Sequence, residues 1–383
     1  MPVKCGIIST VFRYRRKILA ITQKRVSIRK LEEGMKLGQQ IRDATGRVLI
    51  QSGTMLEGHY IKYLEEHGIN SIIIQEGEDD GGPDVPLSDR AKRAVERTRV
   101  DDPVKVSLRE DVKKRVGEGV QYLFDNTESK NFLETTNNVS DELTKAITKY
   151  DAVAIDIAQL KVSDEYTFKH SVDVASLAMI IAKKYGMKRD ELREIGIAGL
   201  LHDVGKSKIP KQILNKPAKL TDEEFHQMKF HSLYGYKILE GNNGFSTAVK
   251  SGVLQHHEKM NGHGYPMAVD GTRIHPYARI ISVADVYDAL VTERPYKKGF
   301  PKKDAIEIIM TMTDDLDIKA MKSFLTSVIL YPVDSIVRLS NGEYGKVVEN
   351  NPDYPLRPKV VATETGIVYD LNNDVKCQHL VIM

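Results

Sequence analysis

The stretch Gly-Leu-Leu-His-Asp-Val-Gly-Lys occupies residues 199–206, and the rest of the chain can be interpreted around it. It places His202 beside Asp203 after an apolar run typical of a buried helix, and Lys206 follows four residues after the histidine. An imidazole and a carboxylate presented together at a helix end are a common pair of metal ligands. The pair alone is a weak signal, so its meaning depends on ligand residues elsewhere in the chain.

The histidines are concentrated around this pair, because eight of the 11 lie between His170 and His275. A neutral imidazole is the commonest protein metal ligand near pH 7, and carboxylates complete the set for hard or borderline metals. The candidate ligands in or at the edge of predicted helices are His170, His202, Asp203, His231, His256, His257 and Asp285. Each of them alone could be an ordinary side chain, but two adjacent pairs with further ligands around them indicate a metal site.

Seven ligands suit two ions rather than one. A carboxylate can bridge metals about 3.5–4 Å apart, and Asp203 is the candidate for that bridge. A water shared by the two ions would ionise near neutral pH and attack a phosphate ester. Lys206 is predicted on the same helix face as His202, where its ammonium would stabilise a phosphate oxygen. A surface lysine is the alternative interpretation.

Outward from this region, the hydrophobic pattern indicates four segments. Residues 1–80 predict a small α/β regulatory domain, with strands at 36–41, 47–50 and 71–75 and a helix at 57–67. Residues 81–150 predict a linker and connecting helices, beginning in an acidic stretch rich in Gly and Pro. Residues 151–330 are almost all helical by period, and residues 331–383 change to a period of two. The predicted fold class is mainly α: a helical bundle with a small N-terminal α/β domain and a short C-terminal β extension.

Composition limits the classes of partner. The formal charge of +3 on 383 residues is too close to zero to indicate a nucleic-acid polymer as partner. Residues 1–30 hold nine Lys or Arg and no acidic residue, which indicates a solvated tail, with a membrane-surface or nucleic-acid contact as the alternative. Cys5 and Cys377 stand at opposite ends and suit a reducing cytosol. No stretch approaches about 18 consecutive apolar residues, so we expect a cytoplasmic protein without a transmembrane segment.

Taken together, the motifs resemble the HD superfamily of metal-dependent phosphohydrolases, and within it the HD-GYP family. The resemblance covers residues 150–330, roughly, and rests on motifs that occur in order. These are Leu-Leu-His-Asp-Val-Gly-Lys (200–206), His-His-Glu-Lys-Met-Asn-Gly-His-Gly-Tyr-Pro (256–266), Ala-Arg-Ile-Ile-Ser-Val-Ala-Asp-Val-Tyr-Asp-Ala-Leu (278–290) and Arg-Pro-Tyr-Lys-Lys (294–298). The two ends of the chain resemble the small domains often found beside HD-GYP modules in bacteria.

The resemblance implies a bacterial signalling enzyme, a cyclic di-GMP phosphodiesterase. Such enzymes open the cyclic dinucleotide to pGpG, and some continue to GMP, through a hydroxide shared by two metals that are usually iron or manganese. The seven ligands above would bind these metals. Lys206 would contact the scissile phosphate, Tyr265 would line the pocket, and Arg294 and Lys297 would hold the dinucleotide. The alternatives are an HD phosphohydrolase acting on another nucleotide, cyclic ones included, and a non-catalytic module that binds cyclic di-GMP. A homodimer and a signalling-protein partner are both left open.

Two positions depart from the family pattern. Some members carry a glutamate one helical turn before the first histidine and bind a third metal, but here that position is Tyr166. Glu165 is adjacent and would point about 100° away on a helix, so we expect two metals, with a third left open if Glu165 precedes regular helix. The signature loop contains Asn261 where Asp is often found, and we expect little effect because Asn keeps the ability to form the turn.

Overall fold

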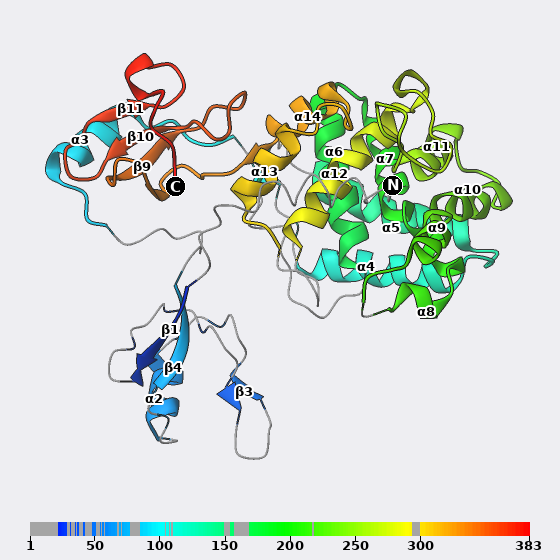
Figure 1. Ribbon diagram of the computed structural model, residues 1–383, viewed down its shortest axis with the longest axis horizontal. Coiled ribbons are helices and arrows are strands. Elements are labelled where there is room, and N and C mark those ends of the chain that lie inside the picture. The colour runs from blue at the N-terminus through cyan, green and yellow to red at the C-terminus, as the bar shows by residue number, and fades with distance from the viewer. Residues whose placement is uncertain are drawn as a thin grey trace. The chain divides into compact units, whose positions relative to one another are not determined.

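The computed structural model separates the chain into two compact units, Met1–Gly82 and Pro83–Met383. In the first unit it describes residues 22–28, 41–42, 48–50, 58–66 and 71–76, with single positions between them. In the second it describes residues 85–103, 105–106, 108, 110–148, 154–156, 168–216, 218–292 and 299–383. Helices and strands carry the labels of Figure 1.

The first unit is a small α/β structure, as predicted. Its elements are β1 (Thr22–Ser27), β2 (Ile41–Arg42), β3 (Val48–Ile50), α2 (Gly58–Glu66) and β4 (Ser71–Glu76). β1 pairs antiparallel with β4, and β2 pairs antiparallel with β3. Because successive side chains of a strand face opposite sides, Ile72 and Ile74 of β4 share one face, and they pack in one core with Leu64 of α2.

The second unit is mainly helical. Its helices are α3 (Asp89–Thr98), α4 (Glu110–Asp125), α5 (Phe132–Thr148), α6 (Lys169–Tyr185), α7 (Arg189–Leu201), α8 (Lys211–Leu214), α9 (Asp222–Lys229), α10 (His231–Gly241), α11 (Thr247–Gln255), α12 (Pro276–Val291), α13 (Lys302–Met310) and α14 (Ile318–Leu325), with 3₁₀ turns η3 (Val204–Lys208), η4 (Gly271–Arg273) and η5 (Val375–Cys377). The predicted fold class, a mainly helical bundle with a C-terminal β extension, is confirmed.

Helix α6 is the centre of the bundle. Every residue from Ser171 to Ala182 is buried, which is typical of a helix surrounded by others. It packs against α7, α12 and α14, and Figure 1 shows these helices in the middle of the helical part. The helix ends at Gly186, which adopts the left-handed conformation of a helix cap, with φ of 99°.

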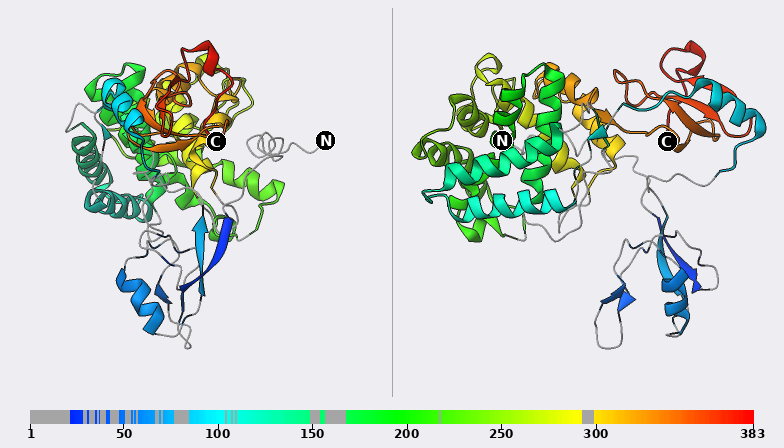
Figure 2. Two further views of the ribbon diagram at one scale, coloured as in Figure 1. Left: turned by 90° about the vertical axis from the view of Figure 1, so that its left-hand side faces the viewer. Right: turned by 180° about the vertical axis from the view of Figure 1, so that it is seen from behind.

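Helices α4 and α5 lie side by side along the bundle, as the right-hand view of Figure 2 shows. Helix α4 buries an apolar stripe at Val112, Val116 and Val120. Arg115 Nε donates a hydrogen bond to Glu142 Oε1 across the pair, at 2.7 Å. The stripe therefore serves helix packing.

The C-terminal β extension is a four-stranded antiparallel sheet. Its strands are β8 (Ile336–Arg338), β9 (Tyr344–Glu349), β10 (Lys359–Ala362) and β11 (Val368–Asp370), in the order β11-β10-β9-β8. Helix α3 covers one face of the sheet, where Ala91 and Val95 pack against Val348 and Val361. The segment around α3, which the sequence placed with the connecting helices, therefore packs with the C-terminal strands.

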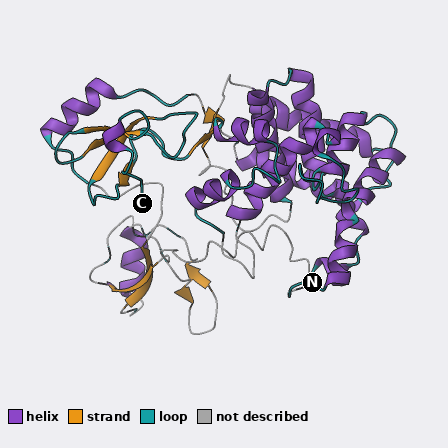
Figure 3. Ribbon diagram, turned by 45° about the horizontal axis from the view of Figure 1, so that its top comes forward, coloured by secondary structure: helices purple, strands orange, loops and turns teal. Residues whose placement is uncertain are grey.

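Short strands appear where the sequence predicted helix. β5 (Lys105–Val106), β6 (Ala154–Asp156) and β7 (Val328–Ile329) form a parallel sheet of three strands, so residues 151–330 are not wholly helical. Near the C-terminus, Leu339 and Ile382 form an isolated antiparallel bridge. Figure 3 shows how little of the bundle is strand. Among the described residues, no helix combines the length and the apolar character needed to cross a membrane.

Candidate metal centre

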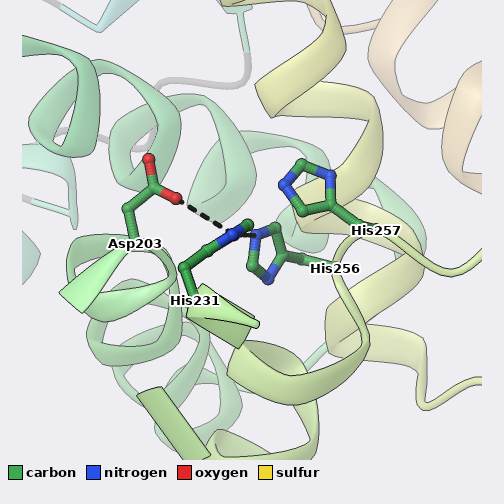
Figure 4. A group of neighbouring side chains, drawn as sticks. All are labelled: Asp203, His231, His256 and His257. Carbon is green, nitrogen blue, oxygen red and sulfur yellow. Dashed lines mark hydrogen bonds and ion pairs between the residues drawn. The ribbon is translucent and has the colours of Figure 1, made fainter. Parts of the chain in front are cut away.

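The seven candidate ligands lie in two neighbouring groups. One group is Asp203, His231, His256 and His257, and the other is His170, His202 and Asp285. Within each group, one nitrogen or oxygen atom from every residue lies within 4.8 Å of the others. Donor atoms about 2.1 Å from a shared ion are separated by roughly 3–4 Å, so both groups are close to the dimensions of a metal site. Figure 4 shows the members of the first group converging from separate segments.

Six of these residues stand at helix ends. His170 lies in the first turn of α6, His202 follows the last residue of α7, and His231 opens α10. Asp203 directly precedes η3, and His256 and His257 follow α11. Asp285 is the exception, since it projects from the middle of α12. A bundle can aim residues inward from several helices in this way.

Two residues of the site lie elsewhere than one continuous helix would place them. The helix that Thr221 caps ends at Lys229, and a second helix starts at His231. Lys206 was expected on the same helix face as His202, but α7 ends at Leu201 and Lys206 lies in the 3₁₀ turn η3.

The 3₁₀ turn is held against the start of α10 by a glycine. A Cβ atom at Gly205 would lie 1.9 Å from the carbonyl oxygen of His231 and 2.4 Å from the backbone nitrogen of Gly235. Only a residue without a side chain permits this approach. Gly205 therefore brings Asp203 and His231 together.

The hydrogen bonds of the imidazoles orient their free nitrogens toward one another. The Nδ1 atoms of His202, His231 and His256 lie 2.7–2.8 Å from the backbone carbonyls of Gly199, Met228 and Val253. A carbonyl can only accept, so each Nδ1 carries the hydrogen and each neutral ring presents a lone pair at Nε2. The Nε2 atoms of His231 and His256 are nevertheless only 3.2 Å apart. Two lone pairs this close fit a shared cation.

Asp203 lies between the two groups. Its Oδ1 is 3.4 Å from His231 Nε2, and its Oδ2 is 3.4 Å from His202 Nε2 and 3.7 Å from His170 Nε2. Oδ1 is buried and has no hydrogen-bond partner among the described residues. A buried carboxylate oxygen without a donor is costly, and a cation would satisfy it. The residues present therefore fit a divalent metal.

The other aspartate, Asp285, also faces both groups, with Oδ1 3.3 Å from His170 Nε2 and Oδ2 3.9 Å from His257 Nδ1. Asp288, one turn further along α12, has Oδ2 2.6 Å from His170 Nδ1. A carboxylate that accepts the second ring hydrogen fixes the tautomer of a metal-ligating histidine. Asp288 thus leaves His170 Nε2 free to bind.

The pKa shifts follow from burial and from these neighbours. Burial lowers the pKa of His256 far below its usual value, and burial with the nearby His231 lowers that of His257 to about 3. Burial opposes charge on His170, but Asp285 and Asp288 raise its pKa to about 10. Burial alone would raise the pKa of Asp203, yet Lys206 and His202 hold it well below the usual range. Asp203 is therefore ionised, and His256 and His257 are neutral, which are the forms that bind metals.

Comparison with known proteins agrees with this chemistry. The profile of the HD domain matches residues 152–319, and that of the KOW domain associated with HD domains matches residues 336–373. A relative in Pseudomonas aeruginosa, cyclic di-GMP phosphodiesterase PA4108, is 35% identical over 266 residues, which are 67% of this chain and 64% of the relative. The chain belongs to the HD-GYP family.

Other HD-GYP relatives match shorter stretches. A cyclic di-GMP phosphodiesterase of Thermotoga maritima is 36% identical over 175 residues, 44% of this chain and 48% of the relative. The 3'3'-cGAMP-specific phosphodiesterase 1 of Vibrio cholerae is 35% identical over 145 residues, 38% of this chain and 33% of the relative. The chain thus spans less than two thirds of the length of each of these relatives.

The HD-GYP signature loop, residues 256–266, lies beside the cluster. The ring of Tyr265 stacks near that of His257, with centroids 4.6 Å apart. Glu258 is buried and its carboxylate accepts hydrogen bonds from the backbone nitrogens of Met267 and Val269, at 2.8 and 3.2 Å. A Cβ at Gly264 would lie 2.4 Å from the Cα of Glu258, so the loop can fold back only at a glycine.

Two lysines border the cluster. Lys206 Nζ forms an ion pair with Asp203 Oδ2. Lys229 Nζ lies 5.6 Å from the ring centroid of Tyr265 and 4.8 Å from that of Phe225. Arg294 and Lys297, and the pair Glu165 and Tyr166 used to judge a third metal, lie outside the described residues.

Sequence reasoning missed Asp288, Glu258 and Lys229 as residues of the site. Asp288 carried one signal, since it stands three residues after Asp285 and so shares its helix face. Glu258 and Lys229 sit beside ligands in the sequence, but nothing in their spacing indicated what their side chains contact.

Proposed function

We propose that the protein is a metal-dependent phosphodiesterase that hydrolyses cyclic di-GMP to pGpG, with further cleavage to GMP. The observation that carries the proposal is the pair of ligand groups on either side of Asp203, with the Lys206 ammonium against the same carboxylate. Two ligand groups that share a carboxylate suit hydrolysis of a phosphate ester. The names of the relatives in Pseudomonas and Thermotoga support cyclic di-GMP as the substrate.

The cofactors we propose are two divalent cations, iron or manganese. Imidazole nitrogens and carboxylate oxygens without thiolates suit these borderline metals. When bound, such a pair supplies Lewis-acid stabilisation to phosphoryl oxygens and lowers the pKa of water. His231, His256 and His257 would hold one cation, and His170, His202 and Asp285 the other, with Asp203 between them.

The remaining residues would bind and orient the substrate. Lys206 is one third exposed, so its ammonium can reach a phosphate oxygen while Asp203 holds its position. Tyr265 offers a ring face beside the cluster for a guanine base. Arg294 and Lys297 are proposed, from the family motif alone, to hold the dinucleotide.

A second candidate substrate is another cyclic dinucleotide. The relative named as 3'3'-cGAMP-specific is as similar to this chain as PA4108 is, at 35% identity, although over a shorter stretch. A non-catalytic module that binds cyclic di-GMP is disfavoured, because a pure binder would need neither the seven ligands nor Lys206. We also propose that the protein is located in the cytoplasm and that it forms a homodimer or binds a signalling protein.

The test is hydrolysis by the purified protein, loaded anaerobically with Fe²⁺ or Mn²⁺. We expect cyclic di-GMP to yield pGpG and then GMP, at a higher kcat/KM than 3'3'-cGAMP, and elemental analysis to find two metals per chain. Chelation should abolish the activity. Binding of cyclic di-GMP without product in fully loaded protein would overturn the catalytic proposal, and a preference for 3'3'-cGAMP would favour the second substrate.

Lys229 is expected to contribute to substrate binding. Its side chain is half-buried beside Tyr265 and pairs with no carboxylate among the described residues, so its charge is available to a phosphate or a base. We expect Lys229→Met to raise KM for cyclic di-GMP by about 10-fold with little change in kcat, as for loss of one charge-assisted contact. Lys229→Arg should stay near the wild-type value.

Lys237→Met is the matched control for Lys229, since Lys237 is exposed on α10. Steady-state kinetics on the three variants make the comparison. Equal KM values for Lys229→Met and Lys237→Met would contradict a role for Lys229.

A further inference from the structure

The signature loop is held by a turn that lies well beyond it along the chain, since 54 residues separate Asn261 from Asp315. Asp315 lies between α13 and α14. Its Oδ2 accepts a hydrogen bond from Lys259 Nζ at 2.7 Å, and its Oδ1 accepts one from Asn261 Nδ2 at 2.8 Å. Its backbone carbonyl accepts from the nitrogen of Met260 at 3.0 Å. Three consecutive loop residues are therefore bound to one residue of the turn.

The same turn is also linked to the segment that follows the loop. Arg279 Nη2 donates to the carbonyl of Gly271 at 3.0 Å, and its Nη1 donates to Asp317 Oδ2 at 3.1 Å. Asp317 in turn caps α14, since its Oδ1 accepts from the nitrogen of Ala320 at 2.7 Å. The turn between α13 and α14 thus contacts the loop that carries Tyr265 directly and is linked through Arg279 to the segment that follows it.

Asn261 is matched to this support. Its Oδ1 accepts from the backbone nitrogen of His263 at 3.0 Å while its Nδ2 donates to Asp315. An amide can accept on one side and donate on the other, whereas an ionised carboxylate can only accept. An aspartate at this position would keep the turn but would bring two carboxylates into contact, which is unfavourable. This contact argues against the expectation that Asn and Asp are equivalent here.

We propose that Asp315 is a positioning residue for the dinucleotide site, and that Asn261 and Asp315 work as a matched pair. The pair holds the loop so that Tyr265 stays stacked near His257. Neither residue is among the metal ligands, so the pair acts on substrate binding rather than on metal content. The inference rests on the proposed function for its substrate, whereas the loop contacts themselves do not depend on it.

The experiment compares Asn261→Asp, Asp315→Asn and the double variant that exchanges the two side chains. In the double variant, the amide introduced in the turn can donate to the carboxylate introduced in the loop, and its carbonyl can accept from Lys259, so the contacts are restored with the charge moved. Asp314→Asn is the matched control, because Asp314 is exposed in the same turn and makes no hydrogen bond or ion pair with the described residues. Each full-length variant is loaded with Mn²⁺ and measured for metal content, kinetics on cyclic di-GMP and hydrogen exchange of residues 259–269.

Substitutions of two residues in contact are not additive, so the double variant should be less impaired than the single variants. We expect Asn261→Asp to raise KM by about 10-fold and Asp315→Asn to raise it by about 3-fold. The KM of the double variant should return to within about 2-fold of the wild-type value. Metal content should not change, and kcat should change less than KM. Hydrogen exchange in the loop should accelerate in Asn261→Asp and recover in the double variant. Asp314→Asn should match wild type in every measurement.

A double variant that is as impaired as the sum of the single ones would overturn the proposal. So would a loss of metal and of kcat in parallel with KM, because that is the signature of a general loss of structure. If the wild-type protein did not hydrolyse cyclic di-GMP, the proposed function would fail, but the exchange measurements would still decide whether the pair holds the loop.

Discussion

Replacement of Asp203 by asparagine is expected to lower kcat on cyclic di-GMP by about 1,000-fold, because about 4 kcal/mol of transition-state stabilisation depends on a correctly held pair of cations. The variant should also retain fewer metal ions than the two per chain expected of wild type. The physical reason is the position of the side chain: Oδ1 faces His231 and Oδ2 faces His202 and His170. Asparagine has the same size but offers one oxygen and no charge.

Elemental analysis and single-turnover kinetics on the same preparation test this expectation. Asp190→Asn is the matched control, because Asp190 is exposed in the first turn of α7, the helix that leads to Asp203. It should bind two metals and turn over normally. Full metal content in Asp203→Asn or Asp203→Ala would show that Asp203 does not bridge the two groups.

The cluster of candidate ligands could be predicted from the sequence because each of its residues sits in a local pattern. His202, Asp203, His256 and His257 are adjacent pairs at the ends of apolar helical runs, and Asp285 is a charge in an apolar helix. A bundle has few ways to bury such residues except toward one another. Their grouping into two sets, with one oxygen of Asp203 toward each, required the packed helices.

Contacts between distant segments could not be predicted. Asp288 meets His170 across 118 residues, and Asp315 meets Asn261 across 54. Neither pair has a spacing that periodicity can detect, because the contact depends on how helices cross rather than on any one helix. The packing of α3 on the C-terminal sheet escaped prediction for the same reason.

The sequence pattern predicts the wrong end for two helices next to the site. The helical pattern continues through Phe230 and through Val204, yet one helix ends at Lys229 and another at Leu201. Close packing of η3 against α10 at Gly205 requires these interruptions. Periodicity describes which face is apolar, and here tertiary contact decided where the helices end.

The interruption at Leu201 changes the argument for Lys206. A lysine four residues after His202 on one helix would simply share a face with it, whereas in η3 its ammonium reaches Asp203 directly. Under the proposed function, it would contact a phosphate oxygen of the substrate there as negative charge develops. We expect Lys206→Met to lower kcat by about 100- to 1,000-fold, as for loss of one preorganised group that stabilises transition-state charge.

Metal content separates this effect from that of Asp203. Lys206 competes with a cation for Asp203 Oδ2, so its removal should leave the metals in place or bind them more tightly. Lys208→Met is the control, since Lys208 lies in the same 3₁₀ turn and pairs with exposed Glu128 at 2.9 Å. Lys206→Arg, which keeps the charge, should retain part of the rate. Loss of metal from Lys206→Met, or a rise in KM at unchanged kcat, would assign Lys206 to structure or to ground-state binding instead of to the transition state.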